Sequence, residues 1–348
     1  MPTAVTPDQL ADFVQTTLAD YDKGEYVNIS FAKQNYPFAN RVFNGKKMGK
    51  KGSHELNWKV KVGTNGNARR TGMYSEDQTN VKDVFQRAKV GWRKYTTSWA
   101  YDIDEEEFQS DDAIQIIDEV LARDADADQD LAELLEIDGW SAPASSTDNK
   151  INGIPYWLVK PTAGQEGFLG GAPAGHSDVA GLSTTSYSGW KSYVADYDAF
   201  SQEDLITKWI RADEKTRFKA PVPTPELKFG ADDYSYYTTF AVWEAMRPLL
   251  RAQNDDLKDD VAAKAGSAMF RGRMIEWVSY LTENDTQNPI YGINWGVFQL
   301  FYKTGRFRVR SGPLRNGTMH DVYENFRDSW INLRCVNRRR GGYCLAQV

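Results

Sequence analysis

The chain has 348 residues, of which 41% are hydrophobic and 26% are charged, and its formal net charge is −6. This composition is typical of a soluble globular protein and provides enough chain for two or three lobes. No apolar run approaches the roughly 20 residues of a membrane-spanning helix, and the start of the chain lacks the basic and apolar regions of a signal peptide. We therefore expect no membrane partner.

The first hundred residues predict a helix, an extended segment and a long hairpin. Thr6 and Pro7 are typical of the N-cap and first position of an amphipathic helix over 7–22, and an aromatic-rich extended stretch follows over 26–43. In the hairpin, apolar residues alternate with polar ones. One limb holds Leu56, Trp58, Val60 and Val62, and the returning limb holds Val84, Ala88, Val90 and Trp92.

The alternation of the returning limb changes phase after Trp92, where Tyr95, Trp99 and Tyr101 take over the apolar positions. We expect a bulge or a sharp bend near Arg93–Tyr95. Limbs of this length would reach roughly 30 Å, and an isolated two-stranded ribbon of that size is marginally stable in water. The hairpin therefore needs a platform, and we expect another subunit to provide it.

Charge is divided into two blocks of opposite sign around this hairpin. Between residues 45 and 99, thirteen Lys and Arg stand against four acids, a balance of +9. Between residues 101 and 138, sixteen acids stand against Arg123 alone, a balance of −15. The acidic block predicts a long helix that is capped by Ser110 and ends at Gly139. Blocks of this size favour pairing between copies of the chain.

The second half of the chain predicts loops, helices and short strands. Ile151–Val159 is typical of a strand, and a Gly/Ser-rich loop over 162–188 is expected to be mobile or to be ordered by neighbours. Ser201 begins a predicted helix over 201–215, and three prolines then mark a lobe boundary. Cys335 and Cys344 are expected to be free buried thiols. The remaining predicted elements are a helix over 236–252 and strands over 274–281, 290–294, 297–302, 307–309 and 330–336.

The order of these parts resembles that of the HK97-like major capsid proteins of tailed bacteriophages. The most similar local sequences are Phe270–Val278, Pro289–Trp295 and the end of the chain from Trp330 to Ala346. The resemblance implies an α+β fold with an N-terminal arm, an extended hairpin called the E-loop, a peripheral domain with a long spine helix, and an axial domain. The implied boundaries are 1–44 for the arm, 45–100 for the E-loop, 101–221 for the peripheral domain with its spine helix over 111–138, 222–325 for the axial domain, and 326–348 for the C-terminal return strand of the peripheral domain.

The resemblance also implies a function. The protein would be a major capsid protein that self-assembles into hexamers and pentamers of an icosahedral shell enclosing double-stranded DNA. It would be located in the capsid of the virion after assembly in the host cytoplasm. Its partners would be a separate scaffolding protein, since no long N-terminal extension precedes the arm, an optional decoration protein, and packaged DNA through weak non-specific contact. No cofactor, metal site or catalytic residue is expected.

The candidate inter-subunit residues lie in the two charge blocks. On the E-loop they are Lys46, Lys47, Lys50, Lys51, Trp58, Lys59, Lys61, Arg69, Arg70, Arg87 and Trp92, and on the spine helix they are Asp118, Glu119, Asp124, Asp126, Asp128 and Asp130. We expect the E-loop of one subunit to lie across the spine-helix region of the next. Exposed ion pairs would set the register, and buried aromatic side chains would supply most of the affinity.

Three alternatives remain open. A nucleic-acid-binding protein is favoured by aromatic residues interleaved with lysines on the hairpin, although the acidic block would repel a phosphate backbone. A basic cluster of Arg334, Arg338, Arg339 and Arg340 is a candidate DNA contact, but such clusters are more often a solvated edge or an inter-subunit patch. An enzyme is disfavoured because His54, His176 and His320 lie far apart and no catalytic motif is found. An encapsulin-like cellular nanocompartment would share the same patterning, and the long basic E-loop favours the virus.

Overall fold

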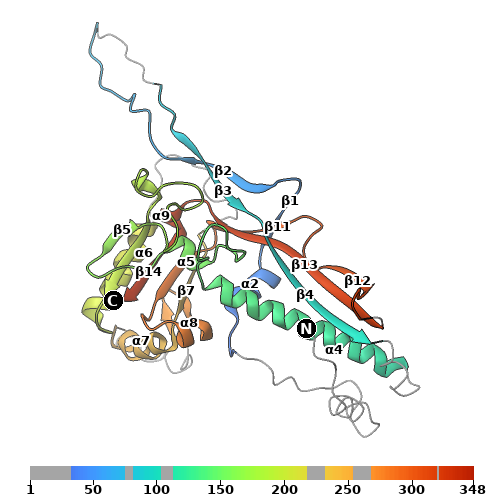
Figure 1. Ribbon diagram of the computed structural model, residues 1–348. Coiled ribbons are helices and arrows are strands. Elements are labelled where there is room, and N and C mark those ends of the chain that lie inside the picture. Colours follow the sequence, from blue (N-terminus) through green and yellow to red (C-terminus); the bar gives the residue numbers. More distant parts are fainter. Residues whose placement is uncertain (1–32, 75–80, 103–112, 218–231, 254–267, 320) are drawn as a thin grey trace.

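The structure is a computed structural model that describes residues 33–74, 81–102, 113–217, 232–253, 268–319 and 321–348. The helix predicted over 7–22 lies outside these residues. Two sheets, of five and seven strands, form the frame of the described chain, and a two-stranded ribbon projects from it towards the upper left of Figure 1.

The described chain begins at residue 33, and a helix, α2 (Pro37–Asn44), occupies the described end of the stretch that was predicted to be extended over 26–43. Pro37 occupies the first helical turn, where its missing N–H is not needed, and Phe38 and Val42 are buried on one face. The prediction was wrong because the aromatic content of this stretch reflects one buried helical face and not the two-residue period of a strand.

The hairpin is a ribbon of two antiparallel strands, β2 (Glu55–Lys61) and β3 (Phe85–Gly91). At Trp92 the chain leaves this ribbon and continues as β4 (Arg93–Asp102), which pairs with β13 (Val322–Cys335) in the five-stranded sheet. The predicted bend therefore lies one residue earlier than expected, and the phase changes because the strand passes from one sheet to another. Tyr95, Trp99 and Tyr101 belong to the body of the molecule and not to the returning limb.

The five-stranded sheet is organised by β13, the longest strand of the described chain at 14 residues. The other strands are β1 (Lys47–Lys50), which is parallel to β11 (Phe298–Lys303), and β12 (Val309–Arg315). β4 lies on one side of β13, and β11 and β12 lie on the other. β13 is much longer than the strand predicted over 330–336 because it pairs with three different strands.

The predicted acidic helix is present as α4 (Ala113–Gly139), which lies along the five-stranded sheet (Figure 1). The Thr97 hydroxyl of β4 donates to the carbonyl of Ala127 at 3.1 Å, and the Tyr95 hydroxyl donates to Asp138 at 2.6 Å. Both side chains point from β4 towards the helix, so α4 covers one face of the sheet.

The seven-stranded sheet makes up the other half of the described chain. Its order is β5 (Glu166–Gly170), β6 (Ser192–Tyr197), β14 (Gly342–Gln347), β10 (Ile290–Asn294), β7 (Tyr234–Thr238), β9 (Arg273–Trp277) and β8 (Met269–Phe270). The accompanying helices are α5 (Ile154–Trp157), η1 (Ser188–Trp190), η2 (Gln202–Ile206), α6 (Thr207–Thr216), α7 (Phe240–Gln253), α8 (Ser279–Asn284) and α9 (Arg338–Gly341). The predicted start of the 201–215 helix is confirmed, and Ser201 is its N-cap, because its hydroxyl accepts from the Asp204 amide at 3.1 Å.

Two predictions for the middle of the chain were wrong. Ile151–Val159 is not a strand, since it contains the short helix α5. The loop over 162–188 needs no neighbouring subunit for its order, because side chains of the same chain hold it. The Trp190 indole donates to the Val179 carbonyl at 3.0 Å, and the Ala180 amide donates to the Tyr156 hydroxyl at 2.9 Å.

The described chain has two clusters of buried apolar side chains. The larger cluster joins α2, the base of the hairpin, α4, the five-stranded sheet and part of the 162–188 loop. The smaller cluster lies between the seven-stranded sheet and α6. Cys335 and Cys344 are both buried and unbonded, as predicted. The hairpin is thus fixed to the body at its base, which leaves its far end to project.

Candidate assembly surfaces

The base of the hairpin packs against the chain's own core. Leu56, Ala88 and Val90 are at most 4% exposed, and the ring of Trp58 lies 6.3 Å from that of Trp157. The prediction that another subunit supplies the platform is therefore wrong for this part of the hairpin. The ribbon is stable within one chain because its apolar face is covered by the body that it projects from.

The opposite face of the ribbon carries cations. Lys59 and Arg87 are direct cross-strand partners, Lys61 follows on the same face, and all three are exposed. Like charges opposite each other on a sheet are destabilising. Among the described residues none of the three has an ion-pair partner. This face is therefore available to an acidic partner.

Three of the predicted contact residues at the hairpin base instead serve the fold of one chain. The Lys47 ammonium donates to the carbonyls of Val42 at 3.1 Å and Phe43 at 2.8 Å, which are left free at the end of α2. Burial, together with the nearby guanidinium of Arg308, lowers the pKa of Lys47. The Trp92 indole donates to the Ser53 carbonyl at 2.9 Å, and Trp58 is in the core contact described above. Lys46 and Lys51 are exposed, and Lys50 is half-buried.

The tip of the hairpin combines exposed cations with exposed apolar side chains. Arg69 and Arg70 are exposed, and Met73, Tyr74 and Val81 are 92%, 103% and 95% exposed. Tyr74 also adopts a φ of +63°, a region that residues other than glycine rarely occupy. The sequence prediction missed these apolar residues because they lie beyond the alternating limbs. They are the most exposed large apolar side chains of the described chain.

The middle of α4 is neutralised within the chain. Arg327 of β13 contacts both Asp124 and Asp128, while Arg310 contacts Asp124 and Arg308 contacts Asp128. Asp124 is only 7% exposed, so its charge is compensated in a buried position. The prediction that a neighbour's basic hairpin compensates Asp124 and Asp128 is therefore wrong.

Two of the predicted acids remain available on this helix. Asp126 and Asp130 are exposed, one turn apart, and neither has an ion-pair partner among the described residues. Partial burial and the like charges of Asp126 and Glu133 raise the pKa of Asp130. Asp118 and Glu119 lie in α4, but their side chains are outside the described part of the structure.

A buried carboxylate joins the N-terminal helix to α4. Glu136 is fully buried, and its two oxygens accept from the Ala39 amide at 2.7 Å and the Trp140 indole at 2.6 Å. Burial raises the pKa of Glu136 to about 7, against the opposing effects of these hydrogen bonds and of Lys33. The Ala39 amide lies in the first turn of α2, where backbone N–H groups have no partner within the helix. Glu136 accepts from this amide, and the N-cap residue Tyr36 makes no side-chain cap hydrogen bond.

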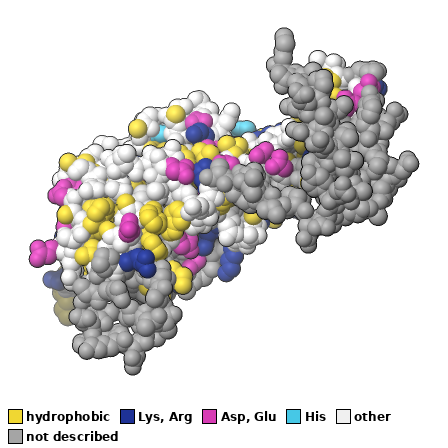
Figure 2. Space-filling view, turned by 90° about the horizontal axis from the view of Figure 1, so that it is seen from below, with side chains coloured by type: hydrophobic (Ala, Val, Ile, Leu, Met, Phe, Trp, Pro, Cys, Tyr) yellow, Lys and Arg dark blue, Asp and Glu magenta, His cyan; other side chains and the backbone are white. Residues whose placement is uncertain are grey.

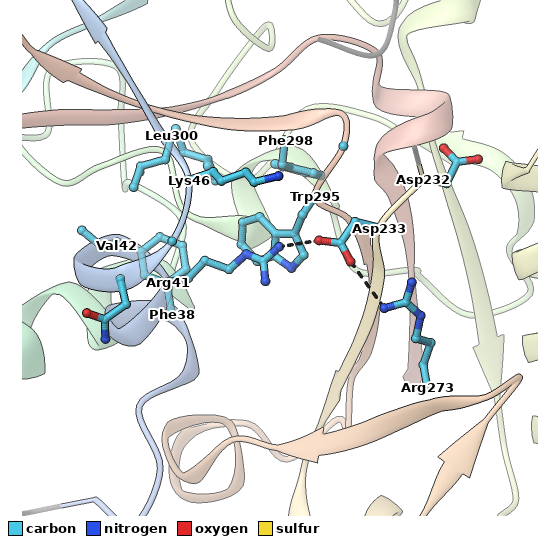
Figure 3. Close-up of a pocket in the computed structure, with 14 residues that line it drawn as sticks. Phe38, Arg41, Val42, Lys46, Asp232, Asp233, Arg273, Trp295, Phe298 and Leu300 are labelled. Atoms are coloured by element: carbon cyan, nitrogen blue, oxygen red, sulfur yellow. Dashed lines mark hydrogen bonds and ion pairs between the residues drawn. The ribbon is translucent and has the colours of Figure 1, made fainter. Parts of the chain in front are cut away.

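A cavity of about 510 Å³ lies where α2 meets the two sheets (Figure 3). The Arg41 guanidinium stacks on Trp295 at 4.3 Å and pairs with Asp233 at 2.9 Å, and Arg273 approaches the same carboxylate at 3.5 Å. Arg41 and Arg273 thus share the carboxylate of Asp233. The side chains that line the cavity include no pair of nucleophile and base, and the arrangement is that of a seam between parts of the chain.

The C-terminal arginines are mostly structural. Arg338 is fully buried and donates to the carbonyls of Trp157, Gly171 and Trp190 at 2.8–2.9 Å. Arg334 is 6% exposed and contacts Gln299, and Arg340 pairs with Asp232 at 3.1 Å. Most of this candidate DNA contact is therefore used inside the fold of one chain. Sequence reasoning could not separate a buried arginine from an exposed one in this run.

Other classes of site receive no support in the described residues. No group of three or more His, Cys, Asp or Glu side chains is placed to hold a metal ion. No helix in the described ranges is long and apolar enough to cross a bilayer. On the face seen from below, Lys and Arg side chains are intermingled with Asp and Glu (Figure 2). A continuous basic surface for nucleic acid is thus not seen on that face.

Neither a protein-family model nor a curated protein sequence matches this chain. Solved structures do match along nearly its whole length. The capsid of cyanophage A-1(L) has a TM-score of 0.62 at 15% identity and covers 96% of this chain and 99% of its own. The capsid of the native GTA particle has a TM-score of 0.58 at 10% identity, covering 100% and 99%. The capsid of Myoviridae phage XM1 has a TM-score of 0.56 at 8% identity, covering all of both chains.

These likenesses establish the fold. The chain has the α+β HK97-like fold of those capsid subunits, as its sequence predicted. At 8–15% identity, these similarities establish the architecture of the chain but do not identify its individual contact residues.

Proposed function

We propose that this protein is a major capsid protein that assembles into hexamers and pentamers of an icosahedral shell around double-stranded DNA. The observation that carries the proposal is a capsid-subunit fold shared from end to end, together with large apolar side chains of the hairpin that are exposed. Met73, Tyr74 and Val81 of the hairpin are almost fully exposed, and exposed large apolar side chains are a common feature of interaction sites. The protein acts as a structural subunit, located in the capsid, without a catalytic role.

Assembly proceeds through head-to-tail contacts, in which one surface of a subunit meets a different surface of the next and the ring closes. The hairpin of one subunit crosses the spine-helix region of its neighbour. The cations available for this contact are Lys59, Lys61 and Arg87, and the acids available are Asp126 and Asp130. Each exposed pair contributes roughly 0–1 kcal/mol, so the pairs set register and partner choice more than affinity.

Further partners are proposed with the shell. A separate scaffolding protein directs assembly in the host cytoplasm, and a decoration protein is an optional outer partner. Contact with packaged DNA is weak and non-specific, because the described C-terminal arginines are mostly used inside the fold.

The proposal is tested by expressing the full chain alone and with its co-expressed scaffolding protein, and examining the products by negative-stain electron microscopy. We expect closed isometric particles, or rings of five and six subunits that close into particles when scaffold is present. A protein that stays monomeric at every salt concentration in both experiments would contradict the proposal. Particles isolated from infected cells that hold protein cargo and no DNA would favour the encapsulin-like alternative.

A further inference from the structure

The cavity where α2 meets the two sheets has an apolar floor (Figure 3). Five buried side chains from three elements form this floor: Phe38 and Val42 of α2, Phe298 and Leu300 of β11, and Leu333 of β13. Packed protein interiors leave few voids larger than a water molecule, whereas pockets that hold ligands measure roughly 300–1,000 Å³. At about 510 Å³ this cavity has the size of a ligand site.

Positive charge exceeds negative charge in the lining of the cavity. Its charged residues are Arg41, Lys46, Arg273, Asp232 and Asp233. Arg41 and Lys46 extend side by side from the α2 end, and Arg273 lies on the far side of Asp233 (Figure 3). Three cations of the lining therefore face two acids.

Both acids are already paired with cations of the same chain. Asp233 is shared by two arginines, as described above, and Asp232 accepts from the Arg340 guanidinium at 3.1 Å. Lys46 is exposed and has no ionic partner among the described residues. Its charge is left uncompensated beside an apolar floor, so it attracts an anionic group that enters the cavity.

Arg41 is also positioned to bind an anion. Its guanidinium lies over the Trp295 ring at 4.3 Å, which fixes its plane, and it donates to Asp233 through one nitrogen. A guanidinium has five N–H donors, and the remaining donors of Arg41 have no acceptor among the described residues. A carboxylate of a ligand can therefore bind Arg41 without displacing Asp233.

The lining specifies the chemistry of the ligand. A large apolar group is needed to cover the floor, and Lys46 and Arg41 beside the floor favour carboxylates. A small inorganic anion would leave the floor in contact with water, and a basic segment would be repelled by Lys46. An acidic peptide segment with one or two aromatic or aliphatic side chains satisfies both parts of the lining.

We propose that this cavity receives an acidic segment of the scaffolding protein, with an apolar side chain on the floor and a carboxylate bound by Lys46 and Arg41. This inference rests on the proposed shell function and assigns where on the subunit that partner docks. The cavity is lined by α2 and by strands of both sheets, so one bound segment contacts the two halves of the described chain. It therefore holds them in one arrangement while the shell forms.

Peptide binding to the unassembled full-length subunit tests the site. The probe is a fluorescein-labelled hexapeptide, Asp-Glu-Phe-Leu-Glu-Asp, whose fluorescence anisotropy reports binding. Lys46→Glu should weaken binding about tenfold or more, because a charge-assisted contact becomes a repulsive one. The matched control is Lys82→Glu, which makes the same charge change at an exposed lysine that does not line the cavity, and it should change binding by less than about twofold.

A second peptide tests the apolar floor and the identity of the partner. Asp-Glu-Ser-Gly-Glu-Asp lacks the apolar pair and should bind about tenfold more weakly. In assembly reactions with scaffolding protein recovered from immature particles, an excess of the Phe-Leu peptide should lower the yield of particles, and the same excess of the Ser-Gly peptide should not.

Equal binding to the Lys46→Glu and Lys82→Glu variants, or equal binding of the two peptides, would overturn this inference, as would assembly that the Phe-Leu peptide does not inhibit. A Lys46→Glu subunit that loses self-association but binds the peptide normally would assign the cavity to a second copy and would also overturn it. All of these outcomes leave the shell function standing. A wild-type chain that forms no particles with or without scaffold would overturn the proposed function itself.

Discussion

At the residue scale, Arg338 is a buried side chain that makes several hydrogen bonds. Its guanidinium is fully buried and, among the described residues, it contacts no carboxylate. Its donors instead go to three backbone carbonyls, from α5, from the loop after β5 and from η1, and to the Ser192 hydroxyl. Removing a buried donor leaves such acceptors unsatisfied, and each costs about 1–3 kcal/mol. Arg338 therefore ties together segments that are distant in sequence.

Replacing Arg338 by lysine should lower the free energy of unfolding by roughly 2–5 kcal/mol, because one ammonium cannot reach all three carbonyls. Urea unfolding of the unassembled subunit measures the change. Arg339→Lys is the matched control, since Arg339 is only half-buried, and its effect should stay below about 1 kcal/mol. Equal effects of the two substitutions would contradict the role assigned to Arg338.

At the element scale, the N-terminal helix is held by a carboxylate of another helix. Glu136 sits in the last turns of α4, where the helix dipole already disfavours negative charge, and it is buried against α2. Lys33 lies next to this contact and pairs with Glu133 at 3.1 Å. The docking of α2 is thus linked to the protonation of a single group.

Since the pKa of Glu136 is raised to about 7 from 4.5, the folded chain binds more protons than the unfolded chain between these values. The free energy of unfolding should therefore fall as pH rises through this window, by up to about 3 kcal/mol, and the contribution should be constant above it. Glu136→Gln should abolish this component. Urea unfolding at about pH 5 and about pH 8 measures it, and an unchanged pH difference in the variant would contradict the assignment.

Helices and strands were predictable from the sequence where the apolar residues followed one clear period. The acidic helix and the two hairpin limbs follow clear periods of 3.6 and 2, and both are present. The helix α2 and the short helix α5 were missed because aromatic and β-branched residues are common in strands. In the structure, burial of these side chains in the core favours a helix at both places. The shift of β4 into a second sheet was visible only as a phase change at Trp92. No local pattern could name β13 as its partner.

At the scale of the whole molecule, the opposite charge blocks are used in part within one chain. Arginines from the end of the chain, among them Arg327, neutralise the middle of α4, so part of the acidic block serves the fold of one subunit. The sequence prediction missed this because the partners are about 200 residues apart. Among the described residues, Asp126, Asp130 and the cationic face of the hairpin are exposed and available for contacts between copies.

The variant Lys59→Glu/Lys61→Glu/Arg87→Glu should fold normally, because all three side chains are exposed, but assemble poorly. Each pair is worth roughly 0–1 kcal/mol, yet the loss is repeated at every contact of a ring. Adding Asp126→Lys/Asp130→Lys to the same chain should restore particles, as counted by electron microscopy. Wild-type yields from the triple variant, or no rescue by the exchange, would contradict the pairing of hairpin and helix.

The passage of one strand from the hairpin into the body at Trp92 has a mechanical consequence. A pull on the hairpin tip is directed along β4, whose hydrogen bonds to β13 run perpendicular to the strand. Such a load shears the whole ladder at once and does not open it one bond at a time. A load applied to the hairpin is therefore carried into the five-stranded sheet as shear along β4, on the side of the sheet that α4 covers.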